Sequence, residues 1–335
     1  MVRTDRPAPT TWVGIDVSQH TLDACLLPAP GGRPRTAAFD NTPAGHAALA
    51  AWADGHASGA TLGFCLESTG AYGEALATAI ADAGRHVAVV NPARIKYAGL
   101  MRGQGNKTDR ADARLIAEYA TRERPAAWQP PRPEVRELQA LSRRRDDLRQ
   151  LAAREKTRLA VPGLSPAART SITRTIAFLE KEADRLQAQA DELIAASQPL
   201  RADRDLLRTI PGVGEVTAHA LLAELPDPSH FDSAQQAAAY AGLAPREYRS
   251  GTSVHKRTRL SKAGNARLRK ALYLPAMTAI RFNPVVGAFY ERLVAAGKAK
   301  MAALGACMRK LLMIAYGVLK SRTAFDPHRG SKMTA

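Results

Sequence analysis

Apolar and polar positions between residues 11 and 119 switch repeatedly between the period of a strand and that of a helix. Two apolar, β-branched runs at 11–17 and 21–27 are separated by three polar residues and predict a β-hairpin. The pattern next predicts a short strand at 36–39, a helix at 43–52, a strand at 61–66, a helix at 72–83, a strand at 86–90 and a helix from 108 or 109 to 119.

This order of elements selects a fold class. Three antiparallel strands followed by alternating helices and strands is the order of a ribonuclease-H-like α/β domain, whereas a doubly wound nucleotide-binding sheet would not open with a hairpin. We therefore expect a ribonuclease-H-like domain at 12–124, preceded by a disordered tail at 1–11. The patterns after residue 133 are helical, so the fold class is α/β plus all-α.

Residues 125–133 contain four prolines and predict a linker to a helical arm at 134–200. The second helix of the arm carries apolar residues at alternating spacings of four and three, which is a heptad seam: Ile172, Ile176, Leu179, Ala183, Leu186, Ala190 and Leu193. On the premise that a helical hairpin cannot bury such a stripe alone, we expect a coiled-coil arm that joins copies of the chain into a dimer or tetramer.

The last domain, 201–325, is predicted to be helical and to contain a helix-hairpin-helix at 206–225. The turn of this motif, Ile210 to Gly214, holds Gly212 and Gly214, whose backbone N–H groups could approach a phosphate closely. A glycine-rich turn without a ligand is the alternative. A helix at 234–241, a polar loop at 242–261 and three helical segments ending near 320 are expected to follow.

Charge changes the picture more than overall composition does. The net charge is +17, and residues 201–335 hold 22 basic and 9 acidic residues, so this region is expected to bind a polyanion. Aromatic residues make up 5%, too few for a single-strand binder built on stacking, and a protein that follows the backbone of double-stranded DNA fits better. A polar N-terminus, three widely spaced cysteines and the lack of a long uninterrupted apolar run favour a cytoplasmic protein without a membrane span.

Candidate phosphate contacts cluster in two loops. Lys107 lies in a glycine-containing loop at 103–108, and nine basic residues against one acidic lie between 246 and 270. From the second region we single out the following as nucleic-acid-binding residues: Arg249, Lys256, Arg257, Arg259 and Lys262. Ser250 precedes a glycine in this cationic loop and could attack phosphorus, although its residue type and position alone are weak support. Ser253 is a lower-ranked alternative.

Four carboxylates are candidate ligands for divalent metal ions. Asp16 lies inside the first apolar strand, where an unpaired charge is costly, and Glu67 ends the buried strand at 61–66. Asp109 and Asp112 are three residues apart and share one face of a helix. Metal-dependent phosphoryl chemistry needs several carboxylate oxygens converging from different elements. Helix capping is the alternative for the last two residues.

Several motifs together resemble the DEDD transposases of bacterial insertion sequences, a group related to the Piv/MooV DNA invertases. They lie at 14–18 (GIDVS), 67–70 (ESTG), 107–112 (KTDRAD), 210–214 (IPGVG), 239–245 (AYAGLAP) and 250–251 (SG). The resemblance implies a RuvC-like nuclease domain whose four carboxylates hold Mg²⁺ (or Mn²⁺), and a transposase domain with Ser250 as nucleophile. It also implies a structured non-coding RNA as guide.

The sequence therefore predicts a bacterial DNA transposase or recombinase that cuts and rejoins DNA at the ends of its own element. Its catalytic residues would be the four carboxylates and Ser250, and it would act near the nucleoid. A RuvC-like structure-selective nuclease would need the carboxylates and not the serine. A non-catalytic DNA-binding protein would need neither.

Overall fold

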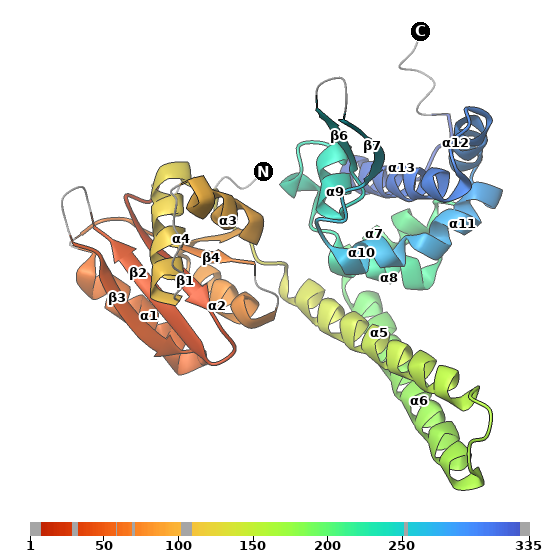
Figure 1. Cartoon of the computed structure of the whole chain (residues 1–335), viewed down its shortest axis with the longest axis horizontal. Coiled ribbons are helices and arrows are strands. Elements are labelled where there is room, and N and C mark those ends of the chain that lie inside the picture. The colour runs from red at the N-terminus through yellow and green to blue at the C-terminus, as the bar shows by residue number, and fades with distance from the viewer. Residues whose placement is uncertain are drawn as a thin grey trace. The chain divides into compact units, whose positions relative to one another are not determined.

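The computed structural model describes residues 8–28, 33–57, 59–68, 71–101, 109–250 and 254–328, and of residues 71, 109, 110, 247–250 and 254–257 it describes the backbone alone. The chain divides into two compact units, Met1–Pro130 and Pro131–Ala335. In Figure 1 the first unit runs from red to yellow and the second from yellow-green to blue. The arm and the C-terminal helices therefore belong to one unit.

The first unit contains a five-stranded sheet of the predicted kind. Its strands are β1 (Thr11–Val17), β2 (Thr21–Leu27), β3 (Arg35–Asp40), β4 (Leu62–Glu67) and β5 (His86–Val90). They lie in the order β3-β2-β1-β4-β5, in which β1–β2 and β2–β3 are antiparallel and β1–β4 and β4–β5 are parallel. Thr11 belongs to β1, as the predicted strand at 11–17 required, and not to the tail in which the predicted domain bounds placed it; residues 1–7 lie outside the described residues.

Helices cover both faces of this sheet (Figure 1). Residues of α1 (Pro43–His56) and α2 (Ala71–Asp82) form one apolar core with Val13, Ile15 and Val17 of β1. Residues of α3 (Pro92–Met101) and α4 (Asp109–Glu123) form a second core with Trp12 and Cys65, which alternate with the first set along their strands. The layers are those of an α/β sandwich.

The end of α4 fixes the direction in which this helix crosses the sheet. Just after it, the carbonyl of Pro125 lies 3.1 Å from Nε2 of His86, the first residue of β5. The N–H of Trp128 then donates to the carbonyl of Val87 at 2.7 Å. The C-terminus of α4 is thus held at the amino ends of the parallel strands. Its N-terminus therefore points towards their carboxyl ends, where the sites of α/β sheets lie.

The arm of the second unit is an antiparallel pair of helices, α5 (Pro133–Leu159) and α6 (Pro166–Ala196) (Figure 1). Ser165 caps α6 by accepting from the N–H of Ala168 at 3.2 Å, and Pro166 occupies the first turn. Ile176, Ala183 and Leu186 on the predicted seam are buried in this chain. The premise that the hairpin cannot bury its stripe was wrong, because α5 covers it.

The rest of the second unit packs around its last helix. The elements are α7 (Gln198–Arg208), α8 (Glu215–Glu224), η1 (Pro228–His230), α9 (Ala234–Tyr240), β6 (Pro245–Ser250), β7 (Val254–Leu260), α10 (Ala266–Ala271), α11 (Tyr273–Phe282), α12 (Pro284–Ala295) and α13 (Lys300–Ser321). By length and composition α13 could cross a membrane, but 61% of its most apolar window is buried inside the unit. It is the central core helix of this unit.

Two expectations for this region were wrong. The predicted polar loop at 242–261 contains an antiparallel hairpin of β6 and β7, so the unit is not all-α. The hairpin was missed because its strands carry closely spaced cationic residues instead of an apolar alternation, while backbone pairing needs no particular side chain. Four helices, and not three segments, follow this hairpin.

Candidate catalytic and nucleic-acid-binding sites

The register of the sheet places Asp16 and Glu67 side by side. Ile15 of β1 pairs with Leu66 of parallel β4, so the next residues on the two strands, Asp16 and Glu67, are neighbours at the carboxyl edge. Both are half-buried. Asp16 lies on the same face of β1 as Gly14, which is the face that α4 covers, and the pairing places Glu67 on that face too.

Gly14 lets α4 approach this edge closely. A Cβ at Gly14 would lie 2.3 Å from the carbonyl oxygen of Ala113 and 2.2 Å from the backbone nitrogen of Ala117, so only glycine fits. Asp16 is two residues beyond Gly14, about 6.6 Å along the strand, which matches roughly one turn of helix. Since α4 runs antiparallel to β1, this step leads to its first turn, where Asp109 and Asp112 lie.

The structure thus brings the backbone positions of all four predicted acids to one edge of the sheet. Asp112 is half-buried, and the side chain of Asp109 lies outside the described part. Among the side chains that the structure describes, no three acidic, histidine or cysteine groups converge closely enough to hold a metal ion. Lys107 lies outside the described residues.

A fifth carboxylate borders this edge and was missed from the sequence. Asp23 of β2 is paired directly with Asp16 of β1 and is also half-buried. Residues that face each other across an antiparallel pair project to the same side, so two acids lie opposite one another. The register of the predicted 11–27 hairpin could have revealed this pair.

Ser250 is the last residue of β6, and its backbone pairs with Val254 at the start of β7. The tip of the hairpin, including Gly251 and Ser253, lies outside the described residues. The structure describes only the backbone of Arg249, Lys256 and Arg257, which places them on the two strands.

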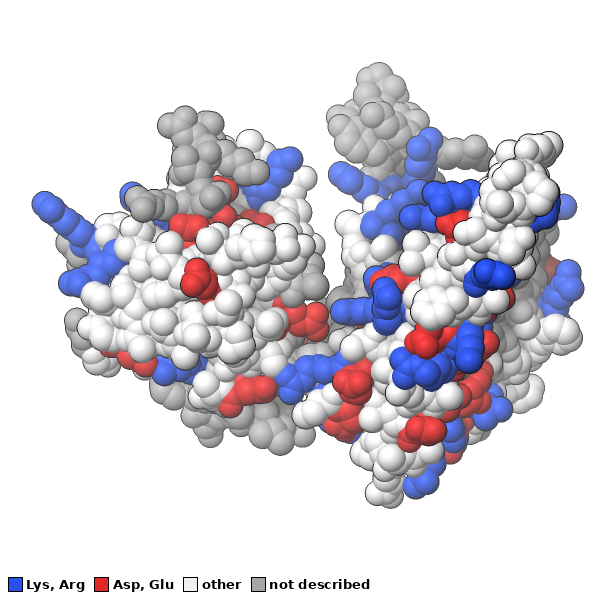
Figure 2. All heavy atoms as spheres, turned by 90° about the horizontal axis from the view of Figure 1, so that it is seen from below, with Lys and Arg blue, Asp and Glu red and all other residues white. Residues whose placement is uncertain are grey.

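Further cations lie near the root of the hairpin. Arg246 and Arg259 face each other across the strands and are exposed, as is Lys262 just after β7. Lys262 has a φ of +56°, an uncommon backbone conformation for a residue other than glycine. Figure 2 shows Lys and Arg side chains gathered over the second unit, on the right of that view. This surface suits a phosphate backbone.

The two glycines of the predicted helix-hairpin-helix differ in their surroundings. Gly212 has a φ of +99°, and a Cβ there would lie 2.7 Å from the Cβ of Ala279 on α11, so this residue is needed for packing. Gly214 is exposed and has open space around it at the start of α8. A phosphate bound at the N-terminus of α8 would lie beside the carboxylate of Glu215, the first residue of this helix. That carboxylate is paired with Arg208 at 3.0 Å.

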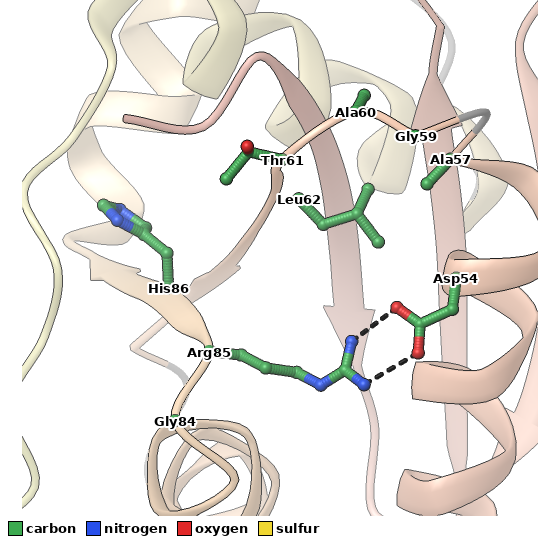
Figure 3. Close-up of a pocket in the computed structure, with 9 residues that line it drawn as sticks. All are labelled: Asp54, Ala57, Gly59, Ala60, Thr61, Leu62, Gly84, Arg85 and His86. Atoms are coloured by element: carbon green, nitrogen blue, oxygen red, sulfur yellow. Dashed lines mark hydrogen bonds and ion pairs between the residues drawn. The ribbon is translucent and has the colours of Figure 1, made fainter. Parts of the chain in front are cut away.

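A hollow of about 490 Å³ lies at the amino ends of β4 and β5, opposite the acidic edge. Figure 3 shows its wall, where Arg85 makes a bidentate pair with Asp54 at 2.6 and 2.7 Å. The arginine lowers the pKa of Asp54, through its hydrogen bond first and against a smaller effect of burial. The hollow contains no residue that the sequence singled out.

Comparison with known proteins identifies the family. Residues 13–161 match the transposase model of the DEDD group of IS110, and residues 204–291 match the model of the IS116/IS110/IS902 transposase family. The chain is 35% identical over 319 residues to the pilin gene-inverting proteins of Moraxella lacunata and Moraxella bovis, covering 94% of this chain and 98% of each relative. An IS110 insertion-element protein of Streptomyces coelicolor is 31% identical over 156 residues, which are 47% of this chain and 37% of that protein.

Each family model covers a continuous set of helices and strands of the structure. The first covers the sheet, α4 and α5, and the second covers α8, the β6–β7 hairpin and α11. The long alignment with the inverting proteins spans both units. The chain therefore belongs to the IS110 family of DEDD transposases and DNA invertases, and it is an enzyme that cleaves and rejoins DNA.

Proposed function

We propose that the protein is the recombinase of an insertion sequence, with a DEDD metal site in its first unit and Ser250 as nucleophile in its second. The observation that carries the proposal is the register that makes Asp16 and Glu67 neighbours on the face covered by α4. In the metal-bound state that we propose, carboxylates from two strands and one helix would come together at this edge of the sheet.

The donor set suits Mg²⁺ or Mn²⁺. Asp16, Glu67, Asp109 and Asp112 would supply only oxygen ligands, which hard divalent cations prefer. When bound, the ions supply activation of the attacking oxygen and stabilisation of the charge that develops on phosphorus. Asp16, Glu67 and Asp112 are half-buried, so each keeps an accessible part that a bound ion could reach.

Ser250 would form the covalent link to DNA. Its Oγ attacks a phosphodiester, an Oγ–P bond forms, the P–O bond to one deoxyribose breaks and that sugar leaves as a hydroxyl. Rejoining reverses these bonds when a hydroxyl of another DNA end attacks the phosphoserine and returns the proton to Ser250. Arg246, Arg259 and Lys262 are exposed around the hairpin root and would bind the neighbouring phosphates.

Two partners complete the proposal. A second copy would dock on the arm, where Phe178 is 64% exposed although Ile176, Ala183 and Leu186 of the seam are buried within the chain. A structured guide RNA would share the basic surface of the second unit with the DNA, which the net charge of +17 supports. Action on chromosomal DNA would place the protein in the cytoplasm at the nucleoid.

Adduct trapping with DNA that carries the ends of the element tests the chemistry. Wild-type protein with Mg²⁺ is expected to form a covalent protein–DNA adduct, which Ser250→Ala abolishes and the exposed control Ser229→Ala does not. Asp16→Asn is expected to abolish cleavage while DNA binding remains. Adducts retained by Ser250→Ala would overturn the serine assignment. Cleavage without any adduct would instead favour the structure-selective nuclease.

A further inference from the structure

Glu224, the last residue of α8, is a carboxylate that the proposed chemistry does not use. Its side chain is 6% exposed and receives two hydrogen bonds from Arg143 of α5, at 2.7 and 3.1 Å, and one from Nδ2 of Asn265 at 2.8 Å. Burial raises the pKa of Glu224, but the bonds from Arg143 and Asn265 outweigh it and hold this pKa below its ordinary value. The pair is bidentate, with a buried carboxylate and a half-buried arginine, and so has a defined geometry.

Asn265 connects Glu224 to the chain on either side of the β6–β7 hairpin. Its Oδ1 accepts from the N–H of Leu268 at 2.9 Å and caps α10, while its own N–H donates to the carbonyl of Tyr240 at 2.7 Å. The residue before it, Gly264, has a φ of +138°, and a Cβ there would lie 2.2 Å from the same Tyr240 oxygen. Asn265 is therefore held against the end of α9.

Two backbone hydrogen bonds join the residues just before β6 to those just after β7, and we call these residues, 242–244 and 261–262, the root of the hairpin. The N–H of Ser261 donates to the carbonyl of Ala244 at 2.9 Å, and that of Lys262 donates to the carbonyl of Gly242 at 3.0 Å. These bonds close the ladder just before β6 begins and just after β7 ends. Hydrogen bonds thus run from α5 through Glu224 and Asn265 to Tyr240, and five residues after Tyr240 the chain begins the strand that ends at Ser250.

Residues 139–147 of α5, which we call the base of the arm, contact α8 and α10. Gln139 of α5 donates to the carbonyl of Ala223 at 2.6 Å, and Arg267 of α10 lies 3.2 Å from Asp147 of α5. Farther along α5, Arg149 pairs with Asp184 of α6, and both side chains are largely exposed. The contacts named here between α5 and the helices α8 and α10 lie between residues 139 and 147 of α5.

We propose that Glu224 is a positioning residue for DNA cleavage: together with Arg143 and Asn265 it fixes the root of the β6–β7 hairpin against the base of the arm. This inference rests on the proposed role of Ser250, because the hairpin presents that residue. A displacement of α5 at Arg143 would then move the hairpin root and change the position of Ser250. The position of the arm would in this way control the rate at which Ser250 attacks the DNA.

Amide hydrogen exchange of the full-length protein without DNA tests the mechanical part. Arg143→Ala is compared with Arg149→Ala, since both remove an arginine of α5 that pairs with a carboxylate. Backbone amides of the hairpin, residues 246–260, are expected to exchange about tenfold faster in Arg143→Ala and at the wild-type rate in Arg149→Ala. Equal rates in the two variants would overturn the coupling.

Single-turnover adduct formation at saturating DNA tests the effect on chemistry. Arg143→Ala is expected to slow adduct formation about 100-fold, as a misplaced nucleophile would, with DNA affinity within about twofold of wild type. Arg143→Lys should restore part of the rate. A role in stability alone would lower the amount of active protein and leave the rate of the folded fraction unchanged, and that result would contradict the proposal.

Glu224→Gln keeps the side-chain volume and the hydrogen bond to Asn265, and it replaces Arg143→Ala in both measurements if that variant fails to fold. Its hairpin exchange rates and its rate of adduct formation are expected to lie between those of wild type and Arg143→Ala. Wild-type values of both rates in Glu224→Gln would contradict the proposal. If the wild-type protein itself forms no Ser250-dependent adduct, the proposed function fails with the positioning role. The exchange comparison then decides separately whether arm and hairpin are coupled.

Discussion

Substitution of Gly14 by alanine is expected to damage both the first unit and its candidate site. The new Cβ would lie 2.2 Å from the backbone nitrogen of Ala117, and ordinary contact distances would force α4 to withdraw by about 1 Å. Backbone atoms of a helix cannot rotate away as a side chain can. We therefore expect a cost at the upper end of overpacking, about 3 kcal/mol, and a fall in the melting temperature of about 10 °C.

The effect on cleavage follows from the same displacement. The first turn of α4 carries Asp109 and Asp112, so a shift of about 1 Å relative to Asp16 is expected to reduce DNA cleavage by about 100-fold. Cleavage is measured at a temperature where circular dichroism shows the variant folded, so that loss of structure does not contribute. Binding of DNA through the second unit should be unchanged.

Gly55→Ala provides a matched control. Gly55 lies in α1, and a Cβ there would meet no heavy atom within 4 Å. Because Gly55 lies in the last turn of α1, alanine there is expected to stabilise the unit by less than about 1 kcal/mol. Equal melting temperatures for Gly14→Ala and Gly55→Ala would refute the close approach of α4 to β1, and with it the proposed metal site.

Three further predictions concern other parts of the molecule. Gly212→Ala is expected to destabilise the second unit by about 2 kcal/mol or more, because its φ is +99° and its Cβ would enter α11, whereas Gly214→Ala should cost less than about 1 kcal/mol in urea denaturation. Burial lowers the pKa of His219 despite nearby carboxylates, so the unfolded chain binds the proton more readily and stability should fall as the pH drops below about 6.5. Thermal melts between about pH 7.5 and 5.5 should show this fall in wild type and less of it in His219→Gln. Arg85→Ala removes a part-exposed pair with Asp54 and should cost at most about 1 kcal/mol, with cleavage unchanged in the adduct assay.

The sequence by itself determined the order of elements and the chemistry of the candidate residues. Continuous apolar, β-branched runs identified β1, β2 and β5 with their observed bounds, because a strand covered on both faces is apolar at nearly every position. Asp16 stood out for the same reason, as a carboxylate inside such a run. Glycine marked the turn at Gly212 through its backbone preference alone.

Only the tertiary structure decided which elements meet. Periodicity shows that a helix has an apolar face and not what covers it, so the seam around Ala183 looked available for a second copy although α5 buries it. The β6–β7 hairpin forms through backbone pairing between strands rich in cations, which leaves no apolar alternation to detect. The bonds of Glu224 to Arg143 and Asn265 join residues 81 and 41 positions apart, and such contacts depend on tertiary packing that no local pattern encodes.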